Sequence, residues 1–272
     1  MRNLAHQPVI SHTFQLVRMQ INLGNQRMTE PIIPTRHDTQ LGRFYEHDGI
    51  YKPSATNILS VVSKGEWYEK WLGNAGSYAI AKDFSTKAAE RGTRVHINCE
   101  ALIAGMIITT DGMPEDEVLC LMAFKEWVDA VRPKFIASEL TMWHKDYPVA
   151  GTADIMCLIK NQLFLIDIKT GGHYDTHGLQ LTAYGELYEL IYGKRPELSV
   201  LRLYVGRGKK PTYDPKRYGY DHKGLFSAIE LWKWQNPTTP KPYIEINLPE
   251  TIQLDKEFIN VEESKESTAP TA

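Results

Sequence analysis

The stretch that most restricts how this chain folds is residues 151–171, GTADIMCLIKNQLFLIDIKTG. Its pattern predicts two β-strands joined by a tight turn at Lys160-Asn161. Because side chains alternate between the two faces of a strand, we expect Asp167 and Lys169 on the same face. Asp154 comes opposite them if the hairpin pairs in register. Two carboxylates and an amine are costly to place at the end of an apolar hairpin unless they have a partner such as a metal ion.

A plainer interpretation of the same residues is a surface pair, Asp167–Lys169, with Asp154 in a turn. A bare D-x-K occurs by chance in many proteins. The residues after the hairpin favour a functional site, because two glycines come next and then a predicted helix, residues 176–192, with Gln180 and Tyr184 one turn apart.

A second predicted helix, residues 86–106, lies upstream and has His96 and Glu100 four residues apart on one face. On its own this pair is typical of a solvated helix face. A predicted strand, residues 135–143, contains Glu139, which is either a third acid near the site or an outward-facing strand residue. A further amphipathic helix, residues 114–131, is expected to be scaffold.

Together these motifs resemble the PD-(D/E)XK nuclease superfamily in its RecB-type exonuclease branch. Asp154, Asp167-Ile168-Lys169 and the helix with Gln180 and Tyr184 match the signature, and Arg91–His96 followed by Glu100 is similar to the first motif. The resemblance runs from about residue 54 to 205. The departure is Ala153, where the family pattern has proline. The resemblance implies an α/β (α+β) restriction-endonuclease-like core, with a central mixed sheet flanked by helices and an added N-terminal helical region.

The resemblance also implies a site for Mg²⁺, with Mn²⁺ as a substitute. The ligands it implies are His96, Asp154, Asp167 and the backbone carbonyl of Ile168. Lys169 would orient the attacking water and stabilise developing negative charge, and Gln180 would hold Lys169 or a water. Glu100 is a further catalytic candidate. Tyr184 would contact the DNA backbone.

Other candidate DNA contacts lie at both ends of the matched region and in its first motif. Ser54 is a good N-cap for a helix expected to run from about residue 54 towards 71, and a helix N-terminus can bind phosphate, although an ordinary cap explains Ser54 as well. Residues 206–210, GRGKK, form a basic loop suited to phosphate contact, but no P-loop pattern is present. The candidates are Ser54, Thr56, Arg91, Arg207, Lys209 and Lys210.

Composition bounds the chain without identifying its partner. The net charge is -2, but the tail, residues 250–272, holds six acids and two lysines, so the rest of the chain is near +2. We expect a poorly ordered extension over 1–40, one nuclease domain over 41–248 and an acidic disordered tail over 249–272. The acid-poor start of the chain is also compatible with a mitochondrial presequence. No apolar run approaches the ~20 residues of a membrane span, so no membrane partner is expected.

The three cysteines are scattered along the sequence, which argues against disulfides and for a reducing compartment. They are too few for an iron–sulfur cluster held by four cysteines, so none is expected. The cytoplasm of a bacterium or of a phage-infected host fits these features.

The sequence therefore predicts a Mg²⁺-dependent deoxyribonuclease, in first place an exonuclease acting at DNA ends in recombination, repair or replication. A structure-specific endonuclease, a non-catalytic DNA-binding module and a structural protein with a coincidental D-x-K remain alternatives. Besides DNA, the expected partners are a strand-annealing protein, a single-strand-binding protein or a helicase.

Overall fold

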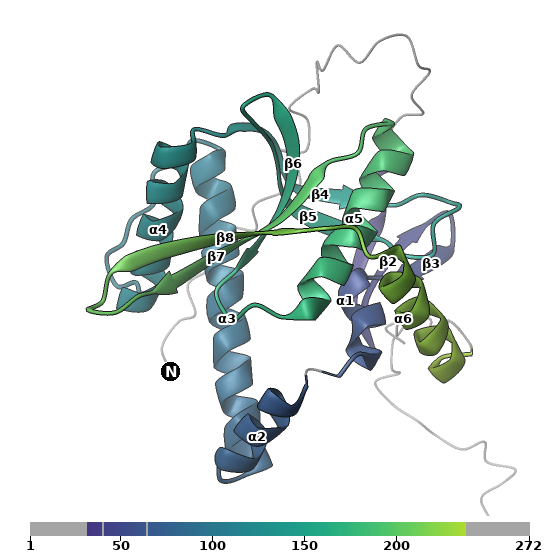
Figure 1. Ribbon diagram of the computed structural model, residues 1–272, viewed down its shortest axis with the longest axis horizontal. Helices are drawn as coiled ribbons and strands as arrows, with labels where there is room; N and C mark the ends of the chain where they lie inside the picture. Colours follow the sequence, from purple (N-terminus) through teal and green to yellow (C-terminus); the bar gives the residue numbers. More distant parts are fainter. Residues whose placement is uncertain (1–31, 40, 64, 238–272) are drawn as a thin grey trace, which may run out of the picture. The chain divides into compact units, whose positions relative to one another are not determined.

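The predicted hairpin forms the middle of a mixed sheet in the computed structural model, which describes residues 32–39, 41–63 and 65–237 (Figure 1). The strand order is β4-β5-β6-β7-β8, and only β6 and β7 run parallel. The strands are β4 (Lys134–Met142), β5 (Gly151–Ile159), β6 (Gln162–Lys169), β7 (Glu197–Val205) and β8 (Pro211–Tyr218). This confirms the expected α+β class with a central mixed sheet flanked by helices.

The β5–β6 hairpin has the turn and the alternation that its sequence predicts. Ile159 pairs with Gln162, and the two turn residues, Lys160 and Asn161, have φ values of 51° and 64°. Two consecutive left-handed residues are the mark of a type I′ turn, whose twist matches that of the strands. Leu163 and Leu165 pack in one core cluster, whereas Phe164, Ile166 and Ile168 pack in the other.

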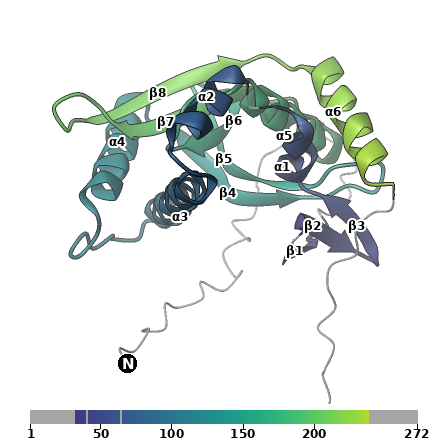
Figure 2. The same cartoon turned by 90° about the horizontal axis from the view of Figure 1, so that it is seen from below.

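Helices cover both faces of this sheet (Figure 2). One face packs against α5 (Asp175–Tyr192), beside which α6 (His222–Gln235) packs in the same core, and the other face packs against α3 (Tyr78–Ile103) and α4 (Glu115–Val131). Helix α5 is the crossover that two parallel neighbours, β6 and β7, require. The residues of the hairpin therefore end between α3 on one side and α5 on the other.

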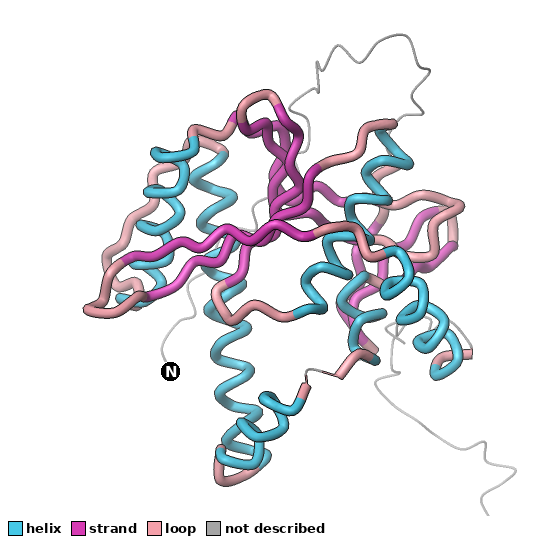
Figure 3. The backbone as a smooth tube through the Cα atoms, viewed as in Figure 1, coloured by secondary structure: helices cyan, strands magenta, loops and turns pink. Residues whose placement is uncertain are grey.

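The N-terminal region combines a small sheet with short helices (Figure 3). It contains the antiparallel strands β1 (Thr35–Thr39), β2 (Gly42–His47) and β3 (Ile50–Pro53). The predicted extension over 1–40 ends too late, because Thr35–Thr39 pairs with β2. Residues 1–31 lie outside the described part of the chain.

The prediction of a single helix from about residue 54 to 71 is wrong. It is divided into α1 (Ala55–Ile58), the 3₁₀ turn η2 (Leu59–Val61) and α2 (Glu66–Asn74). Val62 is extended and Gly65 has a φ of 84°, so the backbone leaves the helical region between η2 and α2. The side chain of Ser54 does cap α1, as predicted, by accepting the N–H of Asn57.

The C-terminal predictions fall largely on residues that the structure does not describe, since the acidic tail and the boundary at residue 248 both lie beyond residue 237. No helix within the described ranges is long and apolar enough to cross a membrane. The last described element, α6, is capped by Asp221, whose carboxylate accepts the N–H of Gly224.

Candidate metal centre

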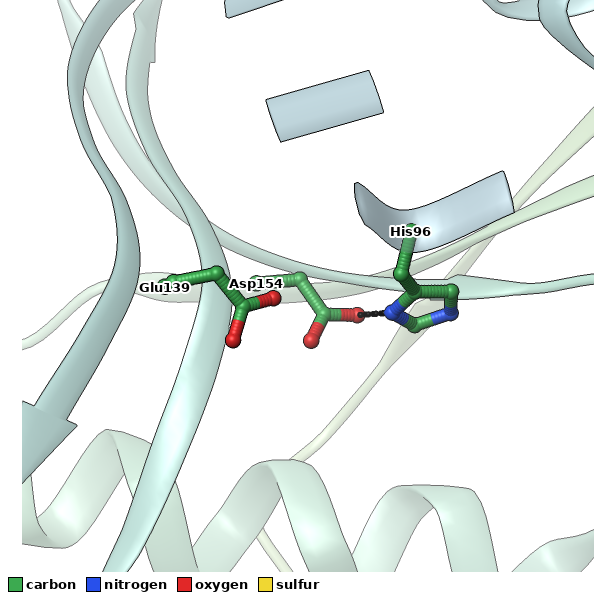
Figure 4. Close-up of side chains that lie close together, drawn as sticks. All are labelled: His96, Glu139 and Asp154. Atoms are coloured by element: carbon green, nitrogen blue, oxygen red, sulfur yellow. Dashed lines mark ion pairs between the residues drawn. The ribbon is translucent and has the colours of Figure 1, made fainter. Parts of the chain in front are cut away.

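Three side chains from three elements converge where β5 leaves its pairing with β6 (Figure 4). His96 comes from the middle of α3, Glu139 from β4 and Asp154 from β5. One ligand atom from each lies within 4.8 Å of the others, and all three residues are half-buried. Such a set of one imidazole and two carboxylates could hold a metal ion.

Asp154 is the centre of this group because its carboxylate contacts two elements at once. Its Oδ2 atom accepts the backbone N–H of Ile168 at 2.7 Å and lies 3.4 Å from Nδ1 of His96. The register of the hairpin explains this position, since pairing of β5 with β6 extends only as far as Ile155 and Ile166. Beyond that pair, Asp154 turns to the freed amide on β6.

Glu139 reaches the group from a strained backbone. Its φ is 49°, although it lies within β4, where φ is normally strongly negative. A left-handed conformation costs a non-glycine residue about 1 kcal/mol or more and tends to persist at functional sites. The pairing of β4 with β5 passes over Glu139, whose neighbours Ser138 and Leu140 pair with Ile155 and Ala153. The backbone pairing is thus interrupted at Glu139, opposite Asp154, and the two carboxylates lie close together.

A second network lies on the α5 side of the same strands. Nζ of Lys169 lies 2.5 Å from Oδ2 of Asp167 and donates to Oε1 of Gln180 at 3.4 Å. Nε2 of Gln180 lies 3.2 Å from Oδ1 of Asp167 and 3.3 Å from the hydroxyl of Tyr184. The amide of Gln180 therefore bridges the carboxylate and the amine of the D-x-K motif.

The electrostatics of the site favour a partner for its carboxylates. Burial opposes protonation of His96, but the Asp154 carboxylate outweighs it and raises the pKa of His96 to about 9. Burial and the charge of Asp154 raise the pKa of Glu139 to about 7. The charge of Asp154 thus opposes the ionisation of Glu139, and a bound cation would relieve this and let both carboxylates ionise, as in a cation site.

Lys169 keeps its charge despite its depth in the protein. Burial favours the neutral amine, yet the carboxylates of Asp167 and Asp154 raise the pKa of Lys169 above its usual value. The site thus contains a fixed ammonium group next to the acids. Such a group is suited to stabilise negative charge that develops on a bound molecule.

The donor set fits a hard divalent cation. Carboxylate oxygens are the usual protein ligands of Mg²⁺, and imidazole with carboxylates also suits Mn²⁺ and related ions. The predicted ligand set differs from this group in three respects. Asp167 is held by Lys169 and Gln180, and the amide of Ile168, not its carbonyl, contacts Asp154. Glu139, which the sequence left undecided, takes the third position in the group.

Glu100 lies one turn after His96 on α3 and is half-buried. Its charge contributes to the raised pKa of Glu139, so it is near the group of three, although it does not belong to it. Helix α3 thus directs two of its side chains towards this end of the sheet, as the predicted spacing of four residues implies.

Several predicted DNA contacts have structural partners instead. Tyr184 is 4% exposed and lies against Gly151, which has no side chain to displace it. Ser54 is buried as the cap of a four-residue helix, and its hydroxyl also lies 2.8 Å from that of Thr56. We therefore find no direct contact surface at Tyr184 or Ser54.

Of the four basic residues predicted to contact DNA, two form ion pairs within the protein and two are exposed. Arg91 pairs with Asp116 at 3.1 Å and donates to the carbonyl of Thr170 at 3.3 Å, so it joins α3 to α4 and to the end of β6. Lys209 pairs with Glu115 at 3.0 Å. The remaining two, Arg207 and Lys210, are exposed at the β7–β8 turn.

Comparisons with known proteins add little to this description. Neither the family models nor the curated proteins searched include a match to this chain. Among solved structures, the crystal structure of SSO0001 is similar at 14% sequence identity and a TM-score of 0.27. That similarity covers 47% of this chain and 61% of the other, so this chain spans less than two thirds of the structure it matches. A likeness at this level supports no inference about function.

Proposed function

We propose that this protein is a divalent-metal-dependent DNA nuclease of the PD-(D/E)XK type. The observation that carries the proposal is the convergence of His96, Glu139 and Asp154 within 4.8 Å, next to the half-buried Lys169 and its partner, the buried Asp167. Metal ligands beside a fixed ammonium are the combination that phosphodiester hydrolysis needs, since both attack and departure create negative charge.

The chain's own residues have distinct parts in this proposal. His96, Glu139 and Asp154 would hold the ion, and the bound ion would supply a more acidic water and charge neutralisation at the scissile phosphate. Lys169 keeps an ammonium beside that position, and Gln180 fixes its direction through the 3.4 Å hydrogen bond. Tyr184 helps to orient Gln180, because its hydroxyl accepts a hydrogen bond from the side-chain amide of Gln180.

Within this class, action at DNA ends is the first expectation, and cleavage within a strand is the alternative. The roles in recombination, repair or replication, and a strand-annealing protein, single-strand-binding protein or helicase as partner, belong to this proposal. So does the cytoplasm of a bacterium or phage-infected host as its location. Circular DNA separates the two modes, because an enzyme that needs an end leaves it intact.

The test is a time course with linear double-stranded DNA, labelled at one 5′ end, in Mg²⁺ or Mn²⁺. Lys169→Ala is expected to slow cleavage by about 10²-fold or more, because it removes the ammonium next to the scissile phosphate. Asp154→Asn should do the same through loss of the ion. The matched control is Lys125→Ala, which removes an exposed lysine that pairs with Asp129 on α4.

Metal-dependent loss of label by wild type and Lys125→Ala, but not by the two site variants, supports the nuclease. Full activity in Lys169→Ala overturns it. Metal binding without cleavage by wild type would replace the enzyme with a DNA-binding module of the same fold.

A further inference from the structure

One face of the β7–β8 hairpin continues the surface that bears Lys169. In the parallel register Lys169 lies beside Arg202 on β7, and Arg202 pairs in turn with Asp214 on β8. Paired residues point to the same face of a sheet, and side chains two apart in a strand share a face. Tyr204 and Lys216 therefore lie on this face as well.

The two faces of the hairpin have different neighbours. Leu201 and Leu203 pack in the core cluster under α4, and Arg217 lies over the ring of Phe164 in that cluster, 5.0 Å from its centroid. Towards its turn, the hairpin passes in front of α4 in Figure 1, and no helix of the described ranges lies on its other side. The face that bears Arg202 and Tyr204 is thus uncovered there, and Lys216, further from the turn on the same face, is exposed.

Arg202 is prepared on this face to bind an anion. Its guanidinium stacks over the ring of Tyr204 at 4.0 Å, and its Nε donates to the carbonyl of Gly171 at 2.7 Å. These contacts fix the plane of the guanidinium group, and a planar guanidinium suits phosphate. In the described part of the chain Arg202 forms no ion pair.

Lys216 supplies the second cation. It is exposed, it lies 4.8 Å from the ring centroid of Tyr218, and it too forms no ion pair within the described residues. The one carboxylate on this face of the β7–β8 hairpin, Asp214, is hydrogen-bonded to Nε2 of His173 at 3.0 Å. Basic groups also collect at the start of α5. Burial, together with three nearby basic side chains, lowers the pKa of His177 to about 3; these side chains are Lys169, His173 and Lys216.

We infer that this face, defined by Arg202, Tyr204 and Lys216, binds the phosphate backbone of the DNA strand that leads into the candidate metal centre. The inference rests on the proposed function for the identity of the strand. Neighbouring strands are about 4.8 Å apart, so Lys169, Arg202 and Lys216 span roughly 10 Å across three strands, which is the scale of successive phosphates. Contacts of this kind position a strand and carry no sequence preference.

The sharpest test compares substitutions of a lysine and the arginine next to it on β8. Lys216→Gln and Arg217→Gln remove the same charge from neighbouring residues, but only Lys216 belongs to the proposed surface. Binding of a fluorescent single strand of about 20 nucleotides is measured by anisotropy in EDTA over a range of salt concentrations. We expect Lys216→Gln and Arg202→Gln to weaken binding about 3- to 10-fold and to lower the salt slope by about 0.7 each, whereas Arg217→Gln keeps the wild-type slope.

With Mg²⁺ present, the first two variants are also expected to raise KM for DNA more than they lower kcat. Equal binding by Lys216→Gln and wild type, or an equal loss in Arg217→Gln, overturns the inference while leaving the nuclease intact. Binding with the expected slopes but without cleavage overturns the nuclease and keeps the surface. A wild-type protein that neither binds nor cleaves DNA overturns both.

Discussion

Glu139 shows what a single residue contributes at this site and what it costs. Its backbone is left-handed at a φ of 49°, and its carboxylate lies beside that of Asp154, so strain and like-charge repulsion act on the same residue. Both effects oppose folding in the absence of a cation. A residue kept under such conditions is better explained by binding than by stability.

Two substitutions at Glu139 are therefore expected to weaken metal binding and to increase the stability of the metal-free protein. Glu139→Gln and Glu139→Gly should each weaken Mn²⁺ binding by about tenfold or more, measured by calorimetry, and each should be more stable than wild type in EDTA. Glu139→Gly should exceed Glu139→Gln by about 1 kcal/mol, because glycine adopts a positive φ without strain. Unchanged Mn²⁺ affinity in both variants would remove Glu139 from the site.

The residues of the D-x-K motif could be predicted because they stand at fixed offsets in a strongly patterned hairpin. Asp154, Asp167, Lys169 and Gln180 do come together in the structure. The place of Glu139 could not be predicted, because it depends on a local departure from strand geometry that alternation does not encode. Nor could the burial of Tyr184, which depends on the contact with Gly151 from another element.

Among the elements, those with a strong local signal were predicted within a few residues, and those set by tertiary context were not. The turn at Lys160-Asn161 and helices α4 and α5 belong to the first kind. Strand β8 belongs to the second, since Pro211 and Pro215 interrupt its sequence and only pairing with β7 extends it. The break between η2 and α2 is explained by the positive φ of Gly65, which the spacing of apolar residues did not predict.

The start of α5 gives a prediction at the same scale. Nδ1 of His177 accepts the backbone N–H of Tyr174 at 3.3 Å, which a protonated imidazole cannot do. The pKa of His177 is lowered from 6.5 to about 3, chiefly by burial. Below pH 6.5 His177 becomes protonated in the unfolded chain but stays neutral in the folded protein. The contribution of His177 to stability is therefore fully present above pH 6.5 and declines as the pH falls towards 3.

We therefore expect His177 to lower the free energy of unfolding of wild type by about 1 kcal/mol relative to His177→Gln between about pH 7.5 and pH 5, allowing for partial solvent screening. His177→Gln keeps an acceptor without a titrating group and should flatten this part of the dependence, as followed by urea unfolding. His47→Gln, at a half-exposed histidine of β2, is the matched control and should retain it. An identical pH dependence in His177→Gln and wild type would contradict the capping role.

At the scale of the whole molecule, the candidate metal centre joins elements that are distant in the sequence. His96 on α3, Glu139 on β4 and Asp154 on β5 would be connected by one ion, so binding should resist separation of α3 from the sheet. A ligand that binds only the folded state stabilises it by mass action, by about 2.7 kcal/mol at a hundredfold excess over Kd.

Mn²⁺ at that excess should accordingly raise the unfolding temperature of wild type, and EDTA should reverse the rise. Asp154→Asn is expected to lose the shift. Asp129→Asn, which removes an exposed acid from α4, is expected to keep it. Differential scanning calorimetry gives both values, and a shift that persists in Asp154→Asn would place the ion elsewhere in the molecule.

The position of β8 at the end of the sheet has a consequence for how copies of this chain behave in concentrated solution. An outer strand presents unpaired backbone groups on which another polypeptide can add. Here Pro211 and Pro215 each lack an N–H group, and Lys216 and Arg217 come after them as two adjacent like charges. Both features discourage edge-to-edge aggregation, so Lys216, which we assign to a DNA strand, also helps to prevent the sheet from pairing with another copy of itself.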